Sequence, residues 1–299
     1  MQQRNIRRRK TEEIIVVNLL KLSGLISIGT TIGIIYVLGS QSIPFFGTVS
    51  LKEFVTGLNW TPLFVPQEFG VMPLINGTFM VAIIAALVAL IFGLGSAFFL
   101  SEYASRKVRS YVKPLLEILA GIPTVVYGYF ALTFVTPIIQ YIAPETIIFN
   151  ALSAGIVMGI MIIPMVSTLS EDAMSAVPRS LREAAYSLGA KKYQVALRIV
   201  FPSAISGIVA SFILSISRAI GETMIVSLAA GGKPALTLNP LEAIQTITAY
   251  IVTVSQGETP QGSIEYQSIF AVGLLLFFLT LIMNLIGRWV VYKYAQEYE

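Results

Sequence analysis

Two opposite charges interrupt a long uncharged stretch of the sequence. Arg218 and Glu222 are the only charged residues between positions 199 and 232, and Thr223 follows them directly. A guanidinium presents planar, paired donors that match the oxygens of phosphate and related oxyanions. Residues four apart share one face of a helix, so the carboxylate would also neutralise the guanidinium. The spacing therefore indicates either a structural ion pair or an anion site in a transport path, and we favour the anion site.

The carboxylate of Glu222 also suggests how one oxyanion would be distinguished from another. An ionised carboxylate only accepts hydrogen bonds, and a protonated phosphate has a hydrogen to donate whereas a fully ionised sulfate has none. We expect Glu222 to hold Arg218 in place between substrate passages and to favour phosphate over sulfate.

The elements around this pair are predicted to lie in a membrane. Hydrophobic residues make up 55% of the 299 residues and charged residues 12%, about half the roughly 25% that soluble domains carry. This composition excludes an ordinary soluble protein and a disordered chain. Uncharged stretches long enough to cross about 30 Å of hydrocarbon recur along the sequence. They predict an all-α, polytopic membrane protein with six transmembrane helices, at 14–38, 74–100, 114–142, 147–169, 203–231 and 268–292.

Arg218 would lie deep in the membrane in this arrangement. It comes sixteen residues after Pro202, or about 24 Å along a helix axis. A charge at that depth is costly and normally faces a protein interior or a water-filled path.

Lysine and arginine are distributed unevenly between the two sides. Sixteen of the twenty fall in the segments that share a side with the N-terminus, and only Lys52 and Lys233 fall on the other. The bias predicts that both termini are cytoplasmic. The basic run Arg7–Lys10 is interpreted as part of this topology signal, not as a nucleic-acid site.

Two outer segments, 39–73 and 232–267, carry more glutamate than lysine and are rich in Pro, Gly and Thr. Within the second, residues 243–257 are uncharged but shorter than a membrane span and contain several Thr, Ser and Gln. We predict that this stretch is a surface or interfacial segment outside the membrane.

Residues needed for several other functions are absent. The sequence has no cysteine and no histidine, which excludes a disulfide, a Cys/His zinc site and a thiol nucleophile. The Gly231-Gly232-Lys233 sequence continues with Pro234 and is therefore no phosphate-binding P-loop. We expect no catalytic residues, metal or cofactor on this chain, so transport must draw its energy from a partner chain or an ion gradient.

The inner loop 170–202 is predicted to form two short helices around a glycine. Pro178 suits a first helical turn, and Gly189 suits a helix end. Leu181, Ala184, Ala185 and Leu188 recur at helical spacing and are expected to form one apolar face. On periodicity alone, a helix lying in the lipid headgroups is an equal alternative.

The exact order of residues in this loop favours the pair of short helices over a helix lying in the lipid headgroups. Glu183, Ala184, Ala185 and Gly189 begin the pattern EAA-x3-G-x9-I-x-F-P, which ends at Pro202. It resembles the EAA motif of ABC importer permeases, with Phe201 in place of the usual Leu. The resemblance implies a coupling helix that docks in a cleft of a separate ATPase subunit.

Two further stretches are similar to permeases of phosphate importers, of the PstC type. One is Arg218-Ala-Ile-Gly-Glu-Thr-Met224, and the other is Ala120-Gly-Ile-Pro-Thr-Val-Val-Tyr-Gly128, in which Thr124 replaces the more common Ser. Gly121 and Pro123 would break or kink their helix beside a cavity, and packing and path-lining roles are equally open. Glu117 is expected at the membrane boundary, paired with Lys113.

The resemblance implies a type I ABC importer (MetI-like) fold and a permease subunit of an ATP-driven phosphate importer in a bacterial inner membrane. Its implied partners are a sister permease (PstA-type), two ATPase subunits (PstB-type) that bind ATP and Mg, and an extracytoplasmic phosphate-binding protein (PstS-type). Expected domains are 1–70 (tail, first helix, outer segment), 71–292 (permease domain) and 293–299 (tail). An ion-coupled oxyanion transporter or channel is the alternative, against which the EAA-type loop argues.

Overall fold

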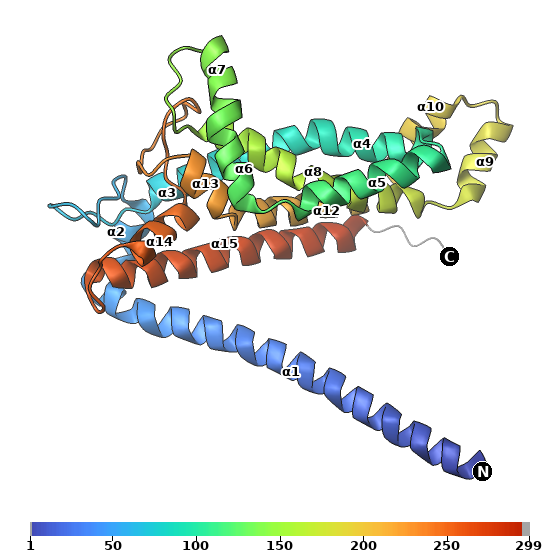
Figure 1. Cartoon of the computed structure of the whole chain (residues 1–299), viewed down its shortest axis with the longest axis horizontal. Coiled ribbons are helices and arrows are strands. Elements are labelled where there is room, and N and C mark those ends of the chain that lie inside the picture. Colours follow the sequence, from blue (N-terminus) through green and yellow to red (C-terminus); the bar gives the residue numbers. More distant parts are fainter. Residues whose placement is uncertain (1, 295–299) are drawn as a thin grey trace.

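The structure is a computed structural model that describes the backbone of residues 2–294 and the side chains of residues 13–293. Within that part the chain forms helices and loops, with one isolated β-bridge between Trp60 and Phe69 (Figure 1). The first half comprises α1 (Gln2–Thr48), α2 (Leu51–Thr56), α3 (Met72–Val88), η1 (Ala89–Leu94), α4 (Gly95–Phe98), η2 (Phe99–Tyr103), α5 (Arg106–Gly121), α6 (Thr124–Phe130), η3 (Ala131–Val135) and α7 (Thr136–Ile142), where η marks π-helical turns. The second half comprises α8 (Ala151–Ser175), α9 (Arg179–Ser187), α10 (Lys192–Val195), η4 (Ala196–Val200), α11 (Phe201–Ser203), α12 (Ile205–Ile220), α13 (Met224–Ala229), α14 (Ile247–Gln256) and α15 (Ile264–Tyr294).

Five helices of the described chain are long and apolar enough to cross a membrane, and a sixth is a bent pair. The pair joins Lys192–Ser203 to Ile205–Ile220 with a bend of 67°. The prediction of an all-α membrane protein with six apolar segments is therefore confirmed, although several boundaries differ. The five unbroken spans are Glu13–Thr48, Met72–Tyr103, Thr124–Ile142, Ala151–Ser175 and Ile264–Lys293.

Helix α8 lies at the centre of the bundle and packs against α3, α5 and α12. Glycines allow the closest contact, with α3: a Cβ at Gly155 would lie 2.6 Å from Cβ of Ile84, and one at Gly159 would lie 2.5 Å from Cβ of Val88. Small residues draw helices together where lipid offers no hydrophobic driving force. On its other side, α8 meets α12 through a hydrogen bond of 2.7 Å between the buried hydroxyls of Ser170 and Ser211.

The predicted third helix, 114–142, is not one helix. Helix α5 ends at Gly121, Ile122 is extended, and α6 begins after Pro123. Proline lacks an N–H and disfavours helical geometry in the preceding residue, which explains the break. Beyond it, α6 and α7 turn away from the long axis of the bundle (Figure 1).

The predicted fifth helix, 203–231, is also broken. Helix α12 ends at Ile220, Gly221 to Thr223 form a non-helical link, and α13 begins at Met224. The half-helices that follow the two breaks, α6 and α13, pack against each other. A Cβ at Gly128 would lie 2.8 Å from Cδ1 of Leu228, so only a glycine lets them approach this closely.

The prediction that residues 243–257 lie on the surface was wrong for the first half of the stretch, whereas residues 253 and 255–257 are exposed. Residues 244–250 are buried, and α14 packs against α3, α13 and α15. The ring of Tyr250 contacts Trp60 in a cluster of edge-to-face aromatic side chains with centroids 4.9 Å apart. The threonines of this stretch, which suggested an exposed segment, instead form hydrogen bonds inside the protein.

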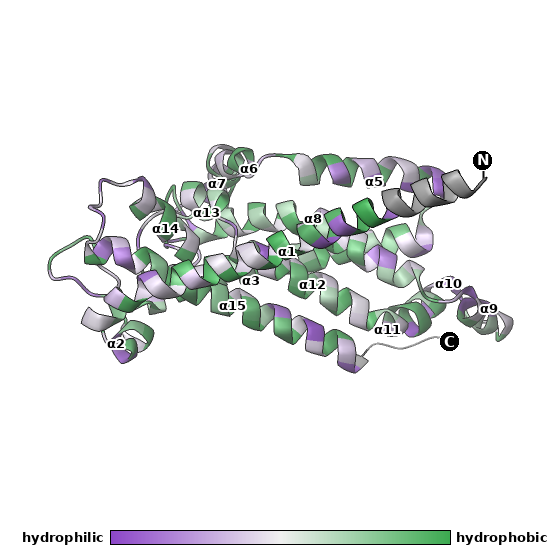
Figure 2. Ribbon diagram, turned by 90° about the horizontal axis from the view of Figure 1, so that it is seen from below, coloured by the Kyte–Doolittle hydropathy of each residue, from purple (hydrophilic) through white to green (hydrophobic). Residues whose placement is uncertain are grey.

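Both ends of the bundle are more hydrophilic than its middle. Hydrophobic residues dominate the helices between them, while hydrophilic residues gather around α9 and in the loops of the opposite end (Figure 2). The first and last helical residues both lie at the α9 end, and α1 diverges from the bundle towards its N-terminus (Figure 1). Side chains 13–37 of α1 are exposed, whereas Phe45 is fully buried at the α14 end.

Candidate functional site

The break between α12 and α13 contains the three residues singled out for the substrate path. Arg218 lies two residues before the end of α12, and Glu222 and Thr223 form the link to α13. A helix break exposes backbone groups that need partners, because an unsatisfied group inside a membrane costs several kcal/mol. The hydrogen-bond partners of the groups at this break therefore show what holds it in place.

Glu222 caps the half-helix that follows. Its Oε1 accepts hydrogen bonds from the backbone N–H of Met224, at 3.0 Å, and of Ile225, at 3.5 Å. A carboxylate at this position also suits the positive end of the helix dipole. The predicted ion pair with Arg218 is not formed, because the helix ends between the two residues and the i, i+4 geometry is lost.

The backbone carbonyl of Glu222 is held from a distant part of the chain. The hydroxyl of Thr248, at the start of α14, donates to it at 2.7 Å. Thr248 is buried, and its hydroxyl also lies 3.2 Å from that of Thr246, which caps α14 through the N–H of Ala249. The buried segment 244–250 thus fixes the conformation of the break.

Arg218 is exposed and forms no hydrogen bond or ion pair with any residue that the structure describes. Its helix nevertheless belongs to the bent candidate span. The neighbouring hydroxyls of Ser215 and Ser217 are buried without partners in the described chain. The guanidinium is therefore available to a ligand or to another subunit. Thr223, within the link, donates its hydroxyl to the carbonyl of Gly221 at 3.3 Å.

The break between α5 and α6 is stabilised in a comparable way. The buried Tyr127 donates its hydroxyl to the carbonyl of Leu119 at 2.7 Å, across the break. Gly121 and Pro123 are exposed, and Thr124 is half-buried. The helix break predicted from these residues is present.

The inner loop forms the expected two short helices. Gly189 lies between α9 and α10 with a φ of +81°, a left-handed conformation that favours glycine. Ala185 and Leu181 pack inward, while Glu183 and Ala184 are exposed and Leu188 is 89% exposed. The four apolar residues therefore do not share one buried face, and α9 presents an open surface with apolar and acidic side chains.

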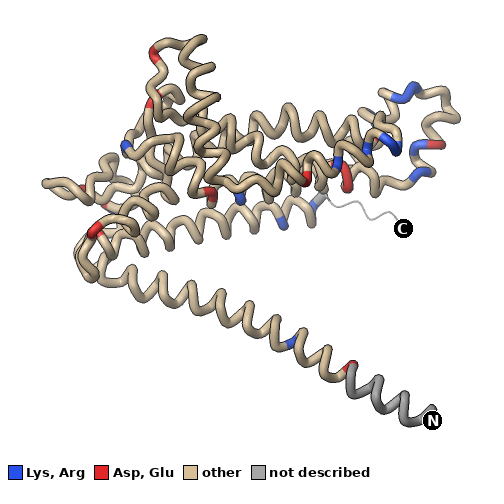
Figure 3. The backbone as a smooth tube through the Cα atoms, viewed as in Figure 1, with Lys and Arg blue, Asp and Glu red and all other residues tan. Residues whose placement is uncertain are grey.

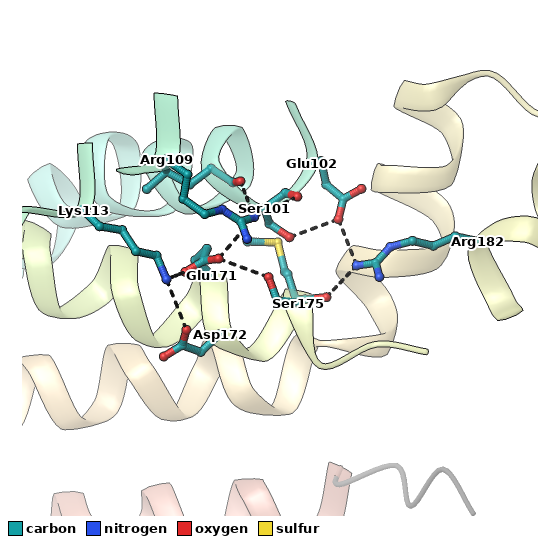
Figure 4. A network of polar contacts seen from close by, with 10 residues as sticks. Ser101, Glu102, Arg109, Lys113, Glu171, Asp172, Ser175 and Arg182 are labelled. Carbon is teal, nitrogen blue, oxygen red and sulfur yellow. Dashed lines mark hydrogen bonds and ion pairs between the residues drawn. The ribbon is translucent and has the colours of Figure 1, made fainter. Parts of the chain in front are cut away.

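A charge network that sequence reasoning missed lies beneath this surface (Figure 4). Arg182 on α9 pairs with Glu102 on η2 at 3.1 Å. Glu171, buried at the end of α8, pairs with Arg109 at 3.3 Å and Lys113 at 2.5 Å, both on α5. The predicted partner of Lys113, Glu117, is instead exposed. In the sequence, the adjacent acidic residues Glu171 and Asp172 at the end of an apolar stretch were the signal that basic partners lie nearby.

The charged residues of the described chain are concentrated towards the α9 end, and few lie along the bundle (Figure 3). The molecule is thus a polytopic helical membrane protein with two broken helices, an unpaired arginine beside one break, and a two-helix projection at the charged end.

Comparison with known proteins defines the family. Residues 89–296 match the family described as "Binding-protein-dependent transport system inner membrane component". "Probable ABC transporter permease protein YqgH" of Bacillus subtilis is 34% identical over 89% of this chain and 86% of its own length. "Phosphate transport system permease protein PstC" of Mesorhizobium japonicum is 31% identical, over 81% of this chain and 78% of its own.

A solved structure shows the same fold. The inward-facing MetNI methionine ABC transporter matches with a TM-score of 0.57 at 17% identity, covering 74% of this chain and 94% of that one. This chain belongs to the family of binding-protein-dependent transport system inner membrane components. Family membership decides against the ion-coupled transporter that the sequence left open, and it confirms the MetI-like permease fold.

Proposed function

We propose that this chain is the membrane-spanning permease subunit of an ATP-driven importer of inorganic phosphate. The observation that carries the proposal is Arg218, a fixed positive charge in an apolar span with no protein partner in the described chain. A charge so placed must face a polar path or a partner subunit, because exposure to lipid is costly. Its planar donors suit a phosphate ion that passes beside the break.

The surroundings of Arg218 support an anion path. The chain breaks between α12 and α13, beside Arg218, and also between α5 and α6. The hydroxyls of Tyr127 and Thr248 donate to backbone carbonyls at these two breaks. The Oε2 atom of Glu222 has no partner among the described residues, so it remains available to a hydrogen donor on the substrate. Several relatives are named phosphate transport permeases, which favours phosphate over other oxyanions.

The proposal includes partner chains. A sister permease would complete the path, and the complex would contain two ATPase subunits, which bind ATP and Mg. One of them would dock on α9 through its exposed face at Glu183, Ala184 and Leu188. No catalytic residue or cofactor is assigned to this chain. In this proposal, residues 71–292 form the permease domain and residues 170–202 form its coupling loop.

We further propose that the α9 end is cytoplasmic in a bacterial inner membrane. Both ends of the helical chain and most of the lysines and arginines lie there (Figures 1 and 3). The opposite end would receive a phosphate-binding protein. Its exposed apolar side chains include Val65, 96% exposed, and Leu238, 90% exposed, one in each predicted outer segment.

The test is transport by the complete complex. The two permeases and the ATPase are reconstituted in vesicles, and uptake and ATP hydrolysis are measured with the binding protein loaded with phosphate, sulfate or molybdate. We expect uptake and stimulated hydrolysis with phosphate alone. Equal transport of sulfate, or phosphate uptake without ATP, would contradict the proposal.

A further inference from the structure

Helix α9 is connected to the rest of the protein by polar contacts of Arg182 and by the apolar packing of Ala185 and Leu181. Arg182 projects from α9 towards Glu102 on η2, and the two side chains are 18% and 6% exposed. The same guanidinium donates to the carbonyls of Met174, at 2.7 Å, and Val177, at 2.8 Å, at the end of α8. Arg182 therefore joins three elements at once (Figure 4).

A second group of charges continues the connection. Glu171, 1% exposed on α8, is paired with Arg109 and Lys113 of α5. It also accepts a hydrogen bond from the hydroxyl of Ser175 at 3.1 Å. Arg109 in turn donates to the carbonyl of Leu100, in η2, at 2.6 Å. Four elements are thus joined by charged side chains: η2, α5, α8 and α9.

Apolar packing of Ala185 and Leu181 supports the same connection, and the charged side chains lie beside it. A cavity of about 410 Å³ lies between α9 and the ends of the membrane helices, with Ser101, Arg109 and Ser175 on its far side. The Glu102–Arg182 pair crosses the edge of this cavity. Separating a buried pair leaves an uncompensated charge, which is strongly unfavourable. A displacement of α9 is therefore expected to carry η2, α5 and α8 with it.

We propose, on the basis of the proposed function, that Glu102 and Arg182 are positioning residues that make α9 and the ends of α5 and α8 move as one body. Helix α5 leads from Arg109 to the break at Pro123, and α8 packs against α12, which leads to Arg218. ATP-driven motion of the docked ATPase would reach both breaks by this route. Without the pair, α9 would follow the ATPase while the path helices lag behind.

The experiment uses the complete complex in lipid nanodiscs and vesicles. The variants are Glu102→Gln, Arg182→Gln and the double variant, and Arg182→Lys keeps the charge if Arg182→Gln folds poorly. Arg288→Gln is the control, because Arg288 is exposed on α15, outside the loop 170–202, and forms no hydrogen bond or ion pair in the described chain. Co-purification of the ATPase, phosphate imported per ATP hydrolysed, and amide hydrogen exchange of residues 179–188 are measured.

We expect each single variant to retain the ATPase, because the exposed face of α9 is unchanged, but to import about tenfold less phosphate per ATP, within the range of coupling between distant sites. Exchange in 179–188 should rise. The double variant should lose no more than either single variant, since both remove one interaction. Unchanged exchange and stoichiometry in the single variants, or losses that multiply in the double variant, would overturn the proposal. A wild-type complex that imports no phosphate would contradict the proposed function. The hydrogen-exchange result would still test whether the Glu102–Arg182 pair holds α9 in place.

Discussion

The hydrogen bond from Thr248 to the carbonyl of Glu222 makes a testable connection between the buried α14 segment and the substrate path. The bond is 2.7 Å long, and Thr248 is 4% exposed. Replacing Thr248 with Val removes the hydroxyl and keeps the branched shape, so packing changes little. The variant therefore isolates the effect of the donor on the break between α12 and α13.

The size of the effect follows from the burial of this site. A buried acceptor that loses its partner costs about 1–3 kcal/mol, which corresponds to about a 5- to 150-fold change in an equilibrium. That cost falls on the conformation that places Arg218 and Glu222 beside the path. We expect Thr248→Val to lower phosphate uptake by about tenfold, within that range, while the complex still assembles.

The assay is binding-protein-dependent uptake by reconstituted vesicles, with ATPase co-purification as the check on assembly. Thr248→Ser is the matched control, because it keeps the donor and should retain most of the uptake. Wild-type uptake in Thr248→Val would refute the argument that the buried hydroxyl holds the break. Equal losses in the Val and Ser variants would show that packing, and not the hydrogen bond, is responsible.

Three other substitutions test separate features of the structure. Gly159→Ala should destabilise the solubilised complex by about 1–3 kcal/mol in thermal denaturation, since its Cβ would lie 2.5 Å from Cβ of Val88. Gly29→Ala is the control and should leave the melting temperature unchanged, because a Cβ there meets nothing within 4 Å. Equal melting temperatures of the two variants would contradict the packing of α8 against α3. Gly189→Pro should abolish ATPase co-purification because proline cannot adopt a φ of +81°, and normal co-purification would count against the coupling helix. Glu222→Gln should weaken the preference for phosphate over sulfate in uptake assays; an unchanged preference would remove the carboxylate from discrimination.

Helix positions and the coupling loop could be predicted from the sequence because both depend on local patterns. Long uncharged stretches locate apolar helices by length alone. The glycine between α9 and α10 marks a turn that few other residues tolerate. The break at Pro123 has an equally local cause, the missing N–H and the restriction on Ile122.

The details of the site could not be predicted because they depend on distant contacts. The spacing of Arg218 and Glu222 suggested an ion pair only if the helix continued. Gly221, directly after Ile220, suits a helix end, but a single glycine does not by itself mark a break. Thr248, which holds the break, is twenty-six residues further along the chain. A polar composition for residues 243–257 is compatible with exposure to water, and equally with a buried segment whose hydroxyls bond to neighbouring backbone.

The charge network illustrates the same limit. Glu102 and Arg182 are eighty residues apart in the chain, and each alone reads as an ordinary residue of a cytoplasmic loop. Their pairing requires knowledge of how α9 sits against η2. The sign bias that predicts topology counts these charges but does not reveal which of them are paired.

The central claim is that Arg218 binds the transported anion, and uptake by the Arg218→Ala complex tests it most directly. Reconstituted vesicles are supplied with phosphate-loaded binding protein and ATP, and assembly is confirmed by co-purification of the ATPase. We predict that the variant complex assembles and imports no phosphate above background. Uptake near the wild-type rate by the assembled Arg218→Ala complex would contradict the claim.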